Sequence, residues 1–220
     1  MKKAILHVHT RPRSSDSSLR PEEAVAAARR LGAKVLVFTE HEVSWERDEL
    51  AALSREVGGG VLLLGARELS CPDAHLVVVG CACDFDPLRP IADVVRGVHQ
   101  RGGAVVLAHP ADLHFQIQPA LAAEWGVDAA EVSTARKRSV PPDRWDEWRA
   151  RNIALTAGLD AHKPSDMKPG FCNLVPDRVE SEQDLARALR ERKIHTNLCR
   201  GEPTGPCPSF RVRHRYRSGV

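Results

Sequence analysis

Residues 4–10 read Ala-Ile-Leu-His-Val-His-Thr (AILHVHT), a short apolar run that contains two histidines two positions apart. Such a run predicts a buried β-strand near the N-terminus. Because alternate residues of a strand point to the same face, the pattern places Ile5, His7 and His9 in one row. Two imidazoles at the end of a buried row are awkward in an apolar core, which indicates that they bind something that needs nitrogen ligands.

Beyond this strand, short apolar segments alternate with amphipathic ones. The sequence predicts further strands over 35–38, 61–65, 75–80, 104–108, 127–132, 153–158 and 194–198. It predicts helices over 21–31, 46–57, 89–101, 120–125, 142–151 and 181–192. Apolar strands joined by helices indicate an α/β protein with a parallel sheet covered by helices. So many strand–helix units in one chain favour a small barrel, and no glycine-rich nucleotide-binding loop is present.

The chain has 220 residues, 42% hydrophobic and 28% charged, which is the composition of a folded globular domain. No apolar run approaches the length of a membrane helix, and the N-terminus lacks the apolar stretch of a secretory signal. The six cysteines are scattered without a C-x-x-C pair, which indicates free thiols in a reducing compartment. We therefore expect a cytoplasmic protein with no membrane partner.

The formal net charge of +3 is too small to indicate a nucleic-acid-binding protein by itself. The positive charge is concentrated near the C-terminus, in the alternating residues Arg211, Arg213, Arg215 and Arg217. We expect a single domain over residues 1–199, followed by a basic tail over 200–220. Such a tail is most often a solvated end, and contact with a phosphate backbone is the alternative.

Polar side chains gather where the predicted strands end. After His7 and His9, these residues are Glu40, His41, Glu68, His109, Asp160 and His162. In a βα barrel the carboxyl ends of the strands meet at one mouth, where such folds keep their chemistry. His, Asp and Glu are ligands of zinc, manganese and iron, so the set predicts a metal centre. His75 is an exception, because it precedes its strand.

In the order of its motifs the chain resembles the PHP (polymerase and histidinol phosphatase) family. The motifs are His7-x-His9-Thr10, Ser15-Asp16, Pro21-Glu22-Glu23, Thr39-Glu40-His41, Glu68, the run from His75 to Gly80, Ala108-His109-Pro110 and Gly158-Leu-Asp-Ala-His162. The resemblance covers residues 4–196. It departs at Ser17, where the family commonly has glycine, and at Glu40, where aspartate is commoner. It implies a distorted (β/α)7 TIM-like barrel with two or three divalent metal ions in its mouth.

Carried over position by position, the resemblance implies three metal positions. The first would be held by His7, His9, Glu68 and Asp160. Glu68 would bridge to a second, completed by His75 and His109. The third would be held by Asp16, His41 and His162. Among these residues, Glu68, His41 and Asp160 are also expected to take part in catalysis.

The charge of such a site favours phosphate chemistry. Even with three carboxylates and a bridging hydroxide, three divalent ions leave the site positive, which suits an anionic ester. We therefore predict a metal-dependent phosphoesterase that hydrolyses phosphomonoesters by attack of a metal-activated hydroxide in a di- or trinuclear site. The predicted partner is a small phosphorylated substrate. The cations predicted to bind its phosphate are Arg11, Arg13, Arg136, Lys137 and Arg138.

Three other functions stay open at this point. The basic residues allow a nuclease or 3′-end-trimming phosphodiesterase on nucleic acid, although base-stacking aromatic residues are few. A non-catalytic metal-binding scaffold would be expected to lack ligands, and none is lacking. Amidohydrolases, which cut C–N bonds, also use an H-x-H motif on the first strand of a barrel. They bridge two metals with a lysine, for which this chain has no obvious candidate.

Overall fold

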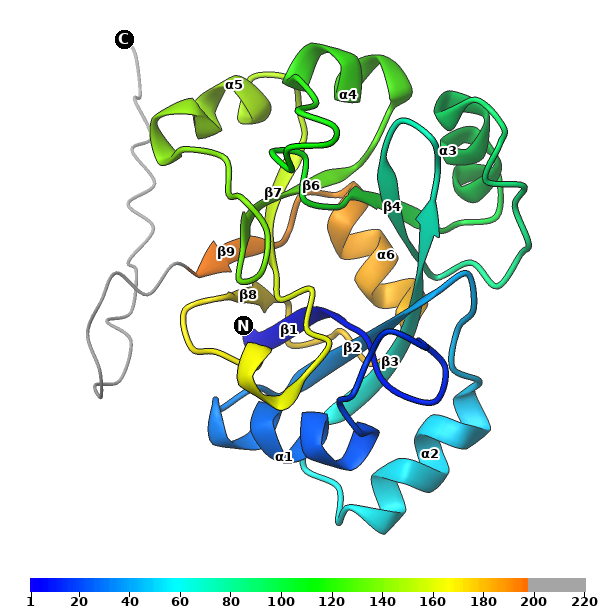
Figure 1. Ribbon diagram of the computed structural model, residues 1–220, viewed down its shortest axis with the longest axis vertical. Helices are drawn as coiled ribbons and strands as arrows, with labels where there is room; N and C mark the ends of the chain where they lie inside the picture. The colour runs from blue at the N-terminus through cyan, green and yellow to red at the C-terminus, as the bar shows by residue number, and fades with distance from the viewer. Residues whose placement is uncertain (198–220) are drawn as a thin grey trace, which may run out of the picture.

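A nine-stranded sheet forms the frame of the protein in the computed structural model, which describes residues 1–197 (Figure 1). Its strands are β1 (Lys2–Val8), β2 (Val35–His41), β3 (Leu62–Ser70), β4 (His75–Val79), β5 (Ala104–Leu107), β6 (Ala129–Thr134), β7 (Ala154–Gly158), β8 (Cys172–Val175) and β9 (His195–Asn197). The predicted tail over 200–220 and the last two residues of the predicted domain lie outside the described residues. Within the described part, no helix has the length and apolar character needed to span a membrane.

Helices connect most of the strands. They are α1 (Pro21–Arg30), α2 (Arg47–Glu56), α3 (Ile91–Gln100), α4 (Pro119–Trp125), α5 (Trp145–Arg149) and α6 (Glu182–Arg190), with short 3-10 turns η1 (Pro142–Arg144) and η2 (Pro164–Asp166). Helix α1 begins with a proline and two glutamates and ends with two arginines, which complements the helix dipole. The helices predicted from sequence are therefore confirmed, with the 142–151 segment divided between η1 and α5.

The sheet curls into a nearly closed barrel, which confirms the predicted fold class. Its strand order is β7-β6-β5-β4-β3-β2-β1-β8-β9. The barrel closes where β1 meets the segment after β7, because Leu159 N donates to Leu6 O at 3.1 Å and His9 N donates to Ala161 O at 2.9 Å. Next to these bonds, the Asn173 side chain of β8 accepts a hydrogen bond from the N–H of Ala157 in β7 and donates one to its C=O. A side-chain amide thus replaces the backbone hydrogen bonds between β7 and β8.

The sheet is mixed, whereas the sequence predicted parallel strands. Strand β4 is antiparallel to both β3 and β5, and β8, which was not predicted, is antiparallel to β1. Strands β3 and β4, which follow each other directly in the sequence, are neighbours in the sheet, with Ser70 opposite His75. Since β4 runs in the reverse direction, its first residue lies at the end of the barrel where β3 finishes. This reversal explains why His75 precedes its strand and still reaches the mouth.

The prediction that Ile5 shares a row with His7 and His9 is wrong. The register between β1 and β2 shifts between Ile5 and Val8, and His7 has a left-handed φ of 62°. This bulge inserts one residue and resets the alternation of faces. Ile5 consequently packs in the outer layer beneath α1, whereas Leu6 belongs to the inner layer. The two histidines can both enter the barrel only because the strand is irregular.

Helix α6 covers the end of the barrel opposite the mouth. Its buried residues Leu185, Ala186 and Leu189 pack with the inner-layer side chains of the strands. Gly80, just after the last residue of β4, has a φ of 70°, and a Cβ there would lie 2.9 Å from the Ala186 Cβ. With this end filled by apolar side chains, the polar residues of the interior are confined to the other end.

Candidate metal centre

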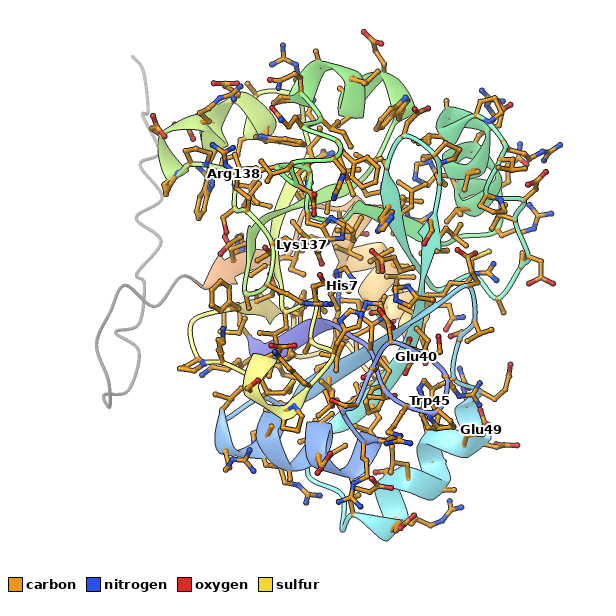
Figure 2. All side chains as sticks on the ribbon, viewed as in Figure 1. His7, Glu40, Trp45, Glu49, Lys137 and Arg138 are labelled. Atoms are coloured by element: carbon orange, nitrogen blue, oxygen red, sulfur yellow. The ribbon has the colours of Figure 1, made fainter. Side chains whose placement is uncertain are left out.

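Nine side chains that the sequence predicts as metal ligands form one connected group at the mouth. His7 lies near the centre of the molecule in Figure 2. The members, each within 3.7 Å of another member, are His7, His9, Asp16, His41, Glu68, His75, His109, Asp160 and His162. The topology brings them together because β1, β2, β3, β5 and β7 end at the mouth and β4 begins there. Except for Asp16, these residues are at least half-buried.

Glu68 occupies the middle of this group, with a side chain that is 1% exposed. Its Oε2 lies 3.5 Å from His7 Nε2, 3.4 Å from His9 Nε2 and 3.3 Å from His41 Nδ1. These distances are longer than strong hydrogen bonds, so the nitrogens surround the oxygen without being closely bonded to it. The gap is what a set of ligands around a small cation would leave.

The second oxygen of Glu68 faces a different pair of histidines. Its Oε1 lies 3.1 Å from His75 Nδ1 and 3.2 Å from His109 Nε2. The two oxygens of one carboxylate therefore point into two ligand groups, as a carboxylate bridging two cations would. Among residues 1–197, three groups have possible ligand atoms within 4.8 Å of one another, namely His7-His9-Glu68, Glu68-His75-His109 and His9-His41-His162.

Two aspartates complete the group from the segments after β1 and β7. Asp160 Oδ1 lies 3.7 Å from His7 Nε2 and 3.5 Å from His9 Nε2. Asp16 Oδ1 lies 3.3 Å from the Nε2 of His41, and its Oδ2 lies 2.9 Å from the Nε2 of His162. Asp16 is half-exposed, so the third ligand group borders solvent whereas the Asp160 side is buried.

The backbone is unusual at three of these positions. His7, His109 and Asp160 have positive φ values of 62°, 28° and 49°. Such values cost a non-glycine residue about 1–3 kcal/mol and persist only where the surrounding structure imposes them. Each of the three side chains is buried in the group. The fold therefore holds these ligands at an energetic cost, which is typical of functional sites.

The electrostatics of the group favour a cation. Burial alone would raise the pKa of Glu68, but His7, His109 and His41 hold it well below its usual value. Burial alone would lower the pKa of His7, yet the charges of Glu131 and Glu68 raise it well above its usual value. A proton on His7 is thus stabilised by the same negative charge that would stabilise a metal ion. Burial lowers the pKa of His9 to about 4, so its nitrogen is free to ligate at neutral pH.

Buried atoms without hydrogen-bond partners test whether the residues fit a metal. Within residues 1–197 these atoms include His7 Nε2, His9 Nε2 and Asp160 Oδ2. Each belongs to the first predicted metal position and lies in the ligand group. A buried polar atom without a partner costs about 1–3 kcal/mol. Coordination to a cation would remove that cost, so the donor set fits a divalent metal ion.

Sequence reasoning missed the residues that hold the ligands in place. Glu40, in the Thr-Glu-His motif, accepts hydrogen bonds from the Thr10 backbone at 2.8 Å, the Ser14 hydroxyl at 2.6 Å and the Trp45 indole at 2.8 Å. It therefore ties the loop after β1 to the end of β2, and Ser14 in turn lies 3.3 Å from His9 Nδ1. The signal that could have identified it is an acid two residues after the apolar run 35–38, within the same strand, where the structure buries it completely.

Glu131, on β6, is the second residue that was missed. Both of its carboxylate oxygens lie 2.9 Å from His7 Nδ1, and it is 1% exposed. Like Glu40, it is an acid within a predicted strand, and its neighbours Ala129, Ala130 and Val132 are small or apolar. That pattern marked a buried charge, although nothing in the sequence identified its partner.

The predicted phosphate-binding cations differ in where they lie. Arg136 is exposed at the mouth, with its Nη1 2.6 Å from His162 Nδ1. Lys137 is paired with Asp112 at 3.0 Å, and Arg138 is exposed in the same loop.

The two arginines of the first loop do not join the ligand group. Arg13 pairs with Glu49 at 2.5 Å and lies 4.6 Å above the Trp45 ring. Glu49 belongs to α2, and Trp45 lies next to this helix (Figure 2). Arg11 is exposed. The ion pair and the aromatic contact hold the Arg13 guanidinium away from the ligands.

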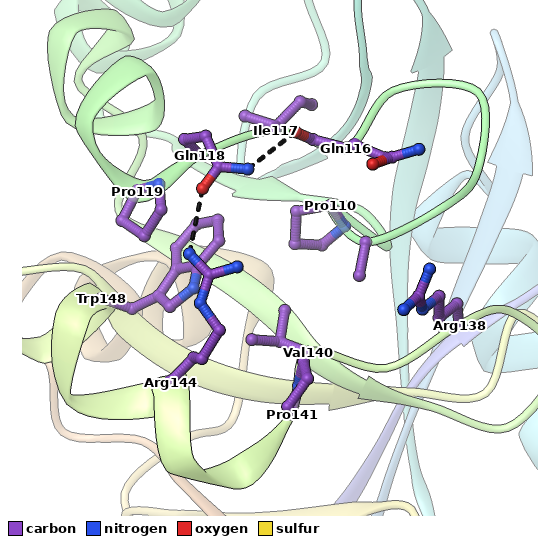
Figure 3. A pocket seen from close by; sticks show the side chains of 11 residues that line it. Pro110, Gln116, Ile117, Gln118, Pro119, Arg138, Val140, Pro141, Arg144 and Trp148 are labelled. Atoms are coloured by element: carbon purple, nitrogen blue, oxygen red, sulfur yellow. Dashed lines mark hydrogen bonds between the residues drawn. The ribbon is translucent and has the colours of Figure 1, made fainter.

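A cavity of about 120 Å³ lies between the segments 110–119 and 138–148 (Figure 3). Pro110, the neighbour of His109, forms one wall, and Arg138 and Arg144 also line it. Arg144 donates to the Gln118 side chain at 3.0 Å, as Figure 3 shows, and it also pairs with Glu147. Much of the Arg144 charge is thereby neutralised.

Comparison with known proteins shows a similarity of fold. No family model and no curated protein matches the sequence. A provisionally named metal-dependent phosphoesterase from Bifidobacterium adolescentis is 17% identical, with a TM-score of 0.57 over 86% of this chain and 96% of its own. PsfC from Pseudomonas syringae is 17% identical, with a TM-score of 0.61 over 87% and 94%. An amidohydrolase from Chromobacterium violaceum, solved with sulfate and no metal, is 16% identical, with a TM-score of 0.53 over 88% and 98%.

Proposed function

We propose that the protein is a metal-dependent phosphoesterase of the PHP type that hydrolyses phosphomonoesters. The observation that carries the proposal is the position of Glu68, a buried carboxylate whose two oxygens face separate groups of histidines. Such an arrangement suits two or three divalent ions, zinc, manganese or iron, in neighbouring positions. The similar folds of a named phosphoesterase and a named amidohydrolase are consistent with a hydrolase.

The proposed ligands are assigned as the three groups. His7, His9, Glu68 and Asp160 would hold the first ion, and Glu68, His75 and His109 the second. Asp16, His41 and His162 would hold a third, with His9 close to the same position. Divalent ions bound there supply a more acidic water and positive charge for the phosphoryl oxygens.

The residues of the chain itself favour an anionic substrate at the mouth. Arg136 presents an exposed guanidinium next to His162, at the edge of the third ligand group. Guanidinium groups bind phosphate oxygens in pairs, so Arg136 is suited to orient the ester. Arg138 lies in the same loop and beside the cavity next to His109, where it would meet the alcohol portion of the substrate.

Two observations bear on the other functions. Because Lys137 is neutralised by Asp112, the basic cluster of this loop is smaller than the sequence indicated, which weakens the case for a nucleic-acid backbone. Cleavage of a C–N bond is the second candidate, since one similar fold belongs to an amidohydrolase.

The decisive experiment compares substrate classes with one preparation. Protein stripped of metal and refilled with Mn²⁺ or Zn²⁺ is assayed on an aryl phosphate monoester, the matching diester and an aryl amide. We expect metal-dependent release from the monoester that is lost in His7→Ala. Faster hydrolysis of the diester would replace the proposal with a phosphodiesterase, and hydrolysis of the amide alone would replace it with an amidohydrolase. Bound metal without any turnover would indicate a scaffold.

A further inference from the structure

The strongest unassigned feature of the site is a buried carboxylate behind the first ligand. Glu131 approaches His7 from the side opposite Glu68: its two oxygens lie 2.9 Å from His7 Nδ1, while His7 Nε2 faces Glu68 and Asp160. The His7 and Glu131 side chains are 0% and 2% exposed. Glu131 is no member of the three ligand groups, so its charge serves a different purpose.

The chemistry of the pair fixes the orientation of the imidazole. A carboxylate only accepts hydrogen bonds, so the nitrogen that faces it must carry a proton. The Nδ1 of His7 is thereby committed to donating, and the lone pair of Nε2 points into the ligand group. A carboxylate behind a ligating histidine also makes the imidazole a stronger donor to the metal.

Glu131 supports a second ligand through the backbone. The N–H of His109 donates to Glu131 Oε2 at 3.3 Å, at a residue whose φ of 28° is strained. The β6 strand changes register between Glu131 and Ser133, opposite the irregular end of β1 at His7. Bulges of this kind redirect side chains next to active sites. Both irregular strands thus converge on the contact between His7 and Glu131.

Gly158 leaves the space that this carboxylate occupies. A Cβ at Gly158 would overlap Oε1 and Cδ of Glu131 and would lie 2.7 Å from Oε2. Gly158 is in β7 and is not one of the glycines with positive φ, so its backbone conformation does not require glycine. Glycine is required at this position because any larger side chain would occupy the space of the Glu131 carboxylate.

We propose that Glu131 is the positioning residue of the metal centre, fixing His7 for coordination, and that position 158 must be glycine to admit the Glu131 carboxylate. The inference rests on the proposed metal-dependent function and specifies how its first metal position is built. A substitution at either position should therefore have the same effect. Replacing Gly158 with alanine should displace the Glu131 carboxylate and lower the affinity for the same metal ion as loss of Glu131 does.

The test measures metal affinity and stoichiometry by Zn²⁺ competition with a chromophoric chelator, for the full chain. Partners behind a ligating histidine typically contribute 10–100-fold in affinity. We expect Glu131→Ala and Gly158→Ala each to lower the affinity for the ion held by His7 by roughly 10–100-fold. Glu131→Gln, whose amide oxygen still accepts from Nδ1, should recover part of the loss. The exposed Glu147→Gln serves as the control.

The double variant gives the sharpest outcome. Once Glu131 is alanine, the Cβ at position 158 meets no carboxylate, so Gly158→Ala should add almost nothing to the effect of Glu131→Ala. Additive losses would overturn the role of Gly158. Unchanged zinc affinity in folded Glu131→Ala, or in Glu131→Gln and Gly158→Ala if the first variant does not fold, would overturn the role of Glu131.

A second readout reports the tautomer directly. In zinc-loaded wild type, ¹H–¹⁵N spectra should show a protected Nδ1–H proton of His7, and this signal should disappear in Glu131→Ala. Neither readout depends on turnover. If the wild type binds zinc and the variants weaken it while no ester is hydrolysed, the inference stands and the phosphatase proposal fails. A wild type that binds no zinc would overturn both.

Discussion

Replacing Glu68 with alanine should disrupt the metal-free protein and the metal centre in separable ways. The side chain is 1% exposed and faces five histidines, three through Oε2 and two through Oε1. Removing one partner of a buried ionic group costs about 3–5 kcal/mol. For a chain of this size each kcal/mol shifts Tm by about 2–4 °C, so the metal-free variant should melt roughly 6–20 °C lower. Differential scanning calorimetry measures this shift.

The same substitution should remove at least one metal ion and the activity. Metal ions contribute several kcal/mol of charge stabilisation to the transition state, and at 1.36 kcal/mol per factor of ten this is at least about a thousandfold in rate. Elemental analysis and monoester hydrolysis measure the two effects, with Glu68→Gln as the variant that keeps the shape and Glu147→Gln as the surface control. If Glu68→Ala binds as many ions as the wild type and keeps full activity, the bridging assignment is refuted.

Three further predictions concern the mouth and its charges. Arg136→Ala should raise KM or lower kcat for phosphomonoesters, because the exposed guanidinium beside His162 would no longer orient the phosphate; if steady-state kinetics show neither, another group binds the ester. Arg13→Ala should leave KM unchanged, since that side chain is already paired with Glu49, and a large rise in KM would show that the arginine moves to the substrate. The Tm of the metal-free protein should be highest near pH 6.5. Below pH 6.5 the stability falls, because His9 has a folded pKa of about 4 and binds a proton more readily in the unfolded chain. Above pH 6.5 the stability also falls, because His7 and His41 have raised pKa values in the folded protein and lose the protons that stabilise it. A Tm that is flat from pH 4 to pH 9 would contradict this balance.

Most of the barrel could be predicted from local patterns, because the helices and the apolar strands carry their own signals. The direction of β4 could not, since its apolar run of four residues, LVVV, reads the same in a parallel and an antiparallel strand. Strand β8 was missed because its four residues, CNLV, contain a buried asparagine whose role is to bond Ala157 in another strand. Contacts of that kind depend on residues distant in the sequence.

The candidate site shows the same division. The nine predicted ligands could be selected because histidines and acids at strand ends are conspicuous. The structure brings them together, and His7 and His9 of the H-x-H pattern both face Glu68. Alternation does put His7 and His9 on one face, as predicted, but the bulge at His7 that turns this face into the barrel could not be seen in the sequence. The proposed roles of Glu131 and Gly158 could not be predicted, because they depend on a contact between two strands, in which the Glu131 carboxylate of β6 fills the space beside Gly158 of β7.

The most direct test of the account is anomalous diffraction from crystals grown with zinc, recorded at the zinc absorption edge. The account predicts at least two strong peaks, one on each side of the Glu68 carboxylate. The first should be bounded by His7, His9 and Asp160, and the second by His75 and His109. A single peak away from Glu68, or no ordered zinc in the mouth, would contradict the claim that this carboxylate joins the histidines into one metal centre.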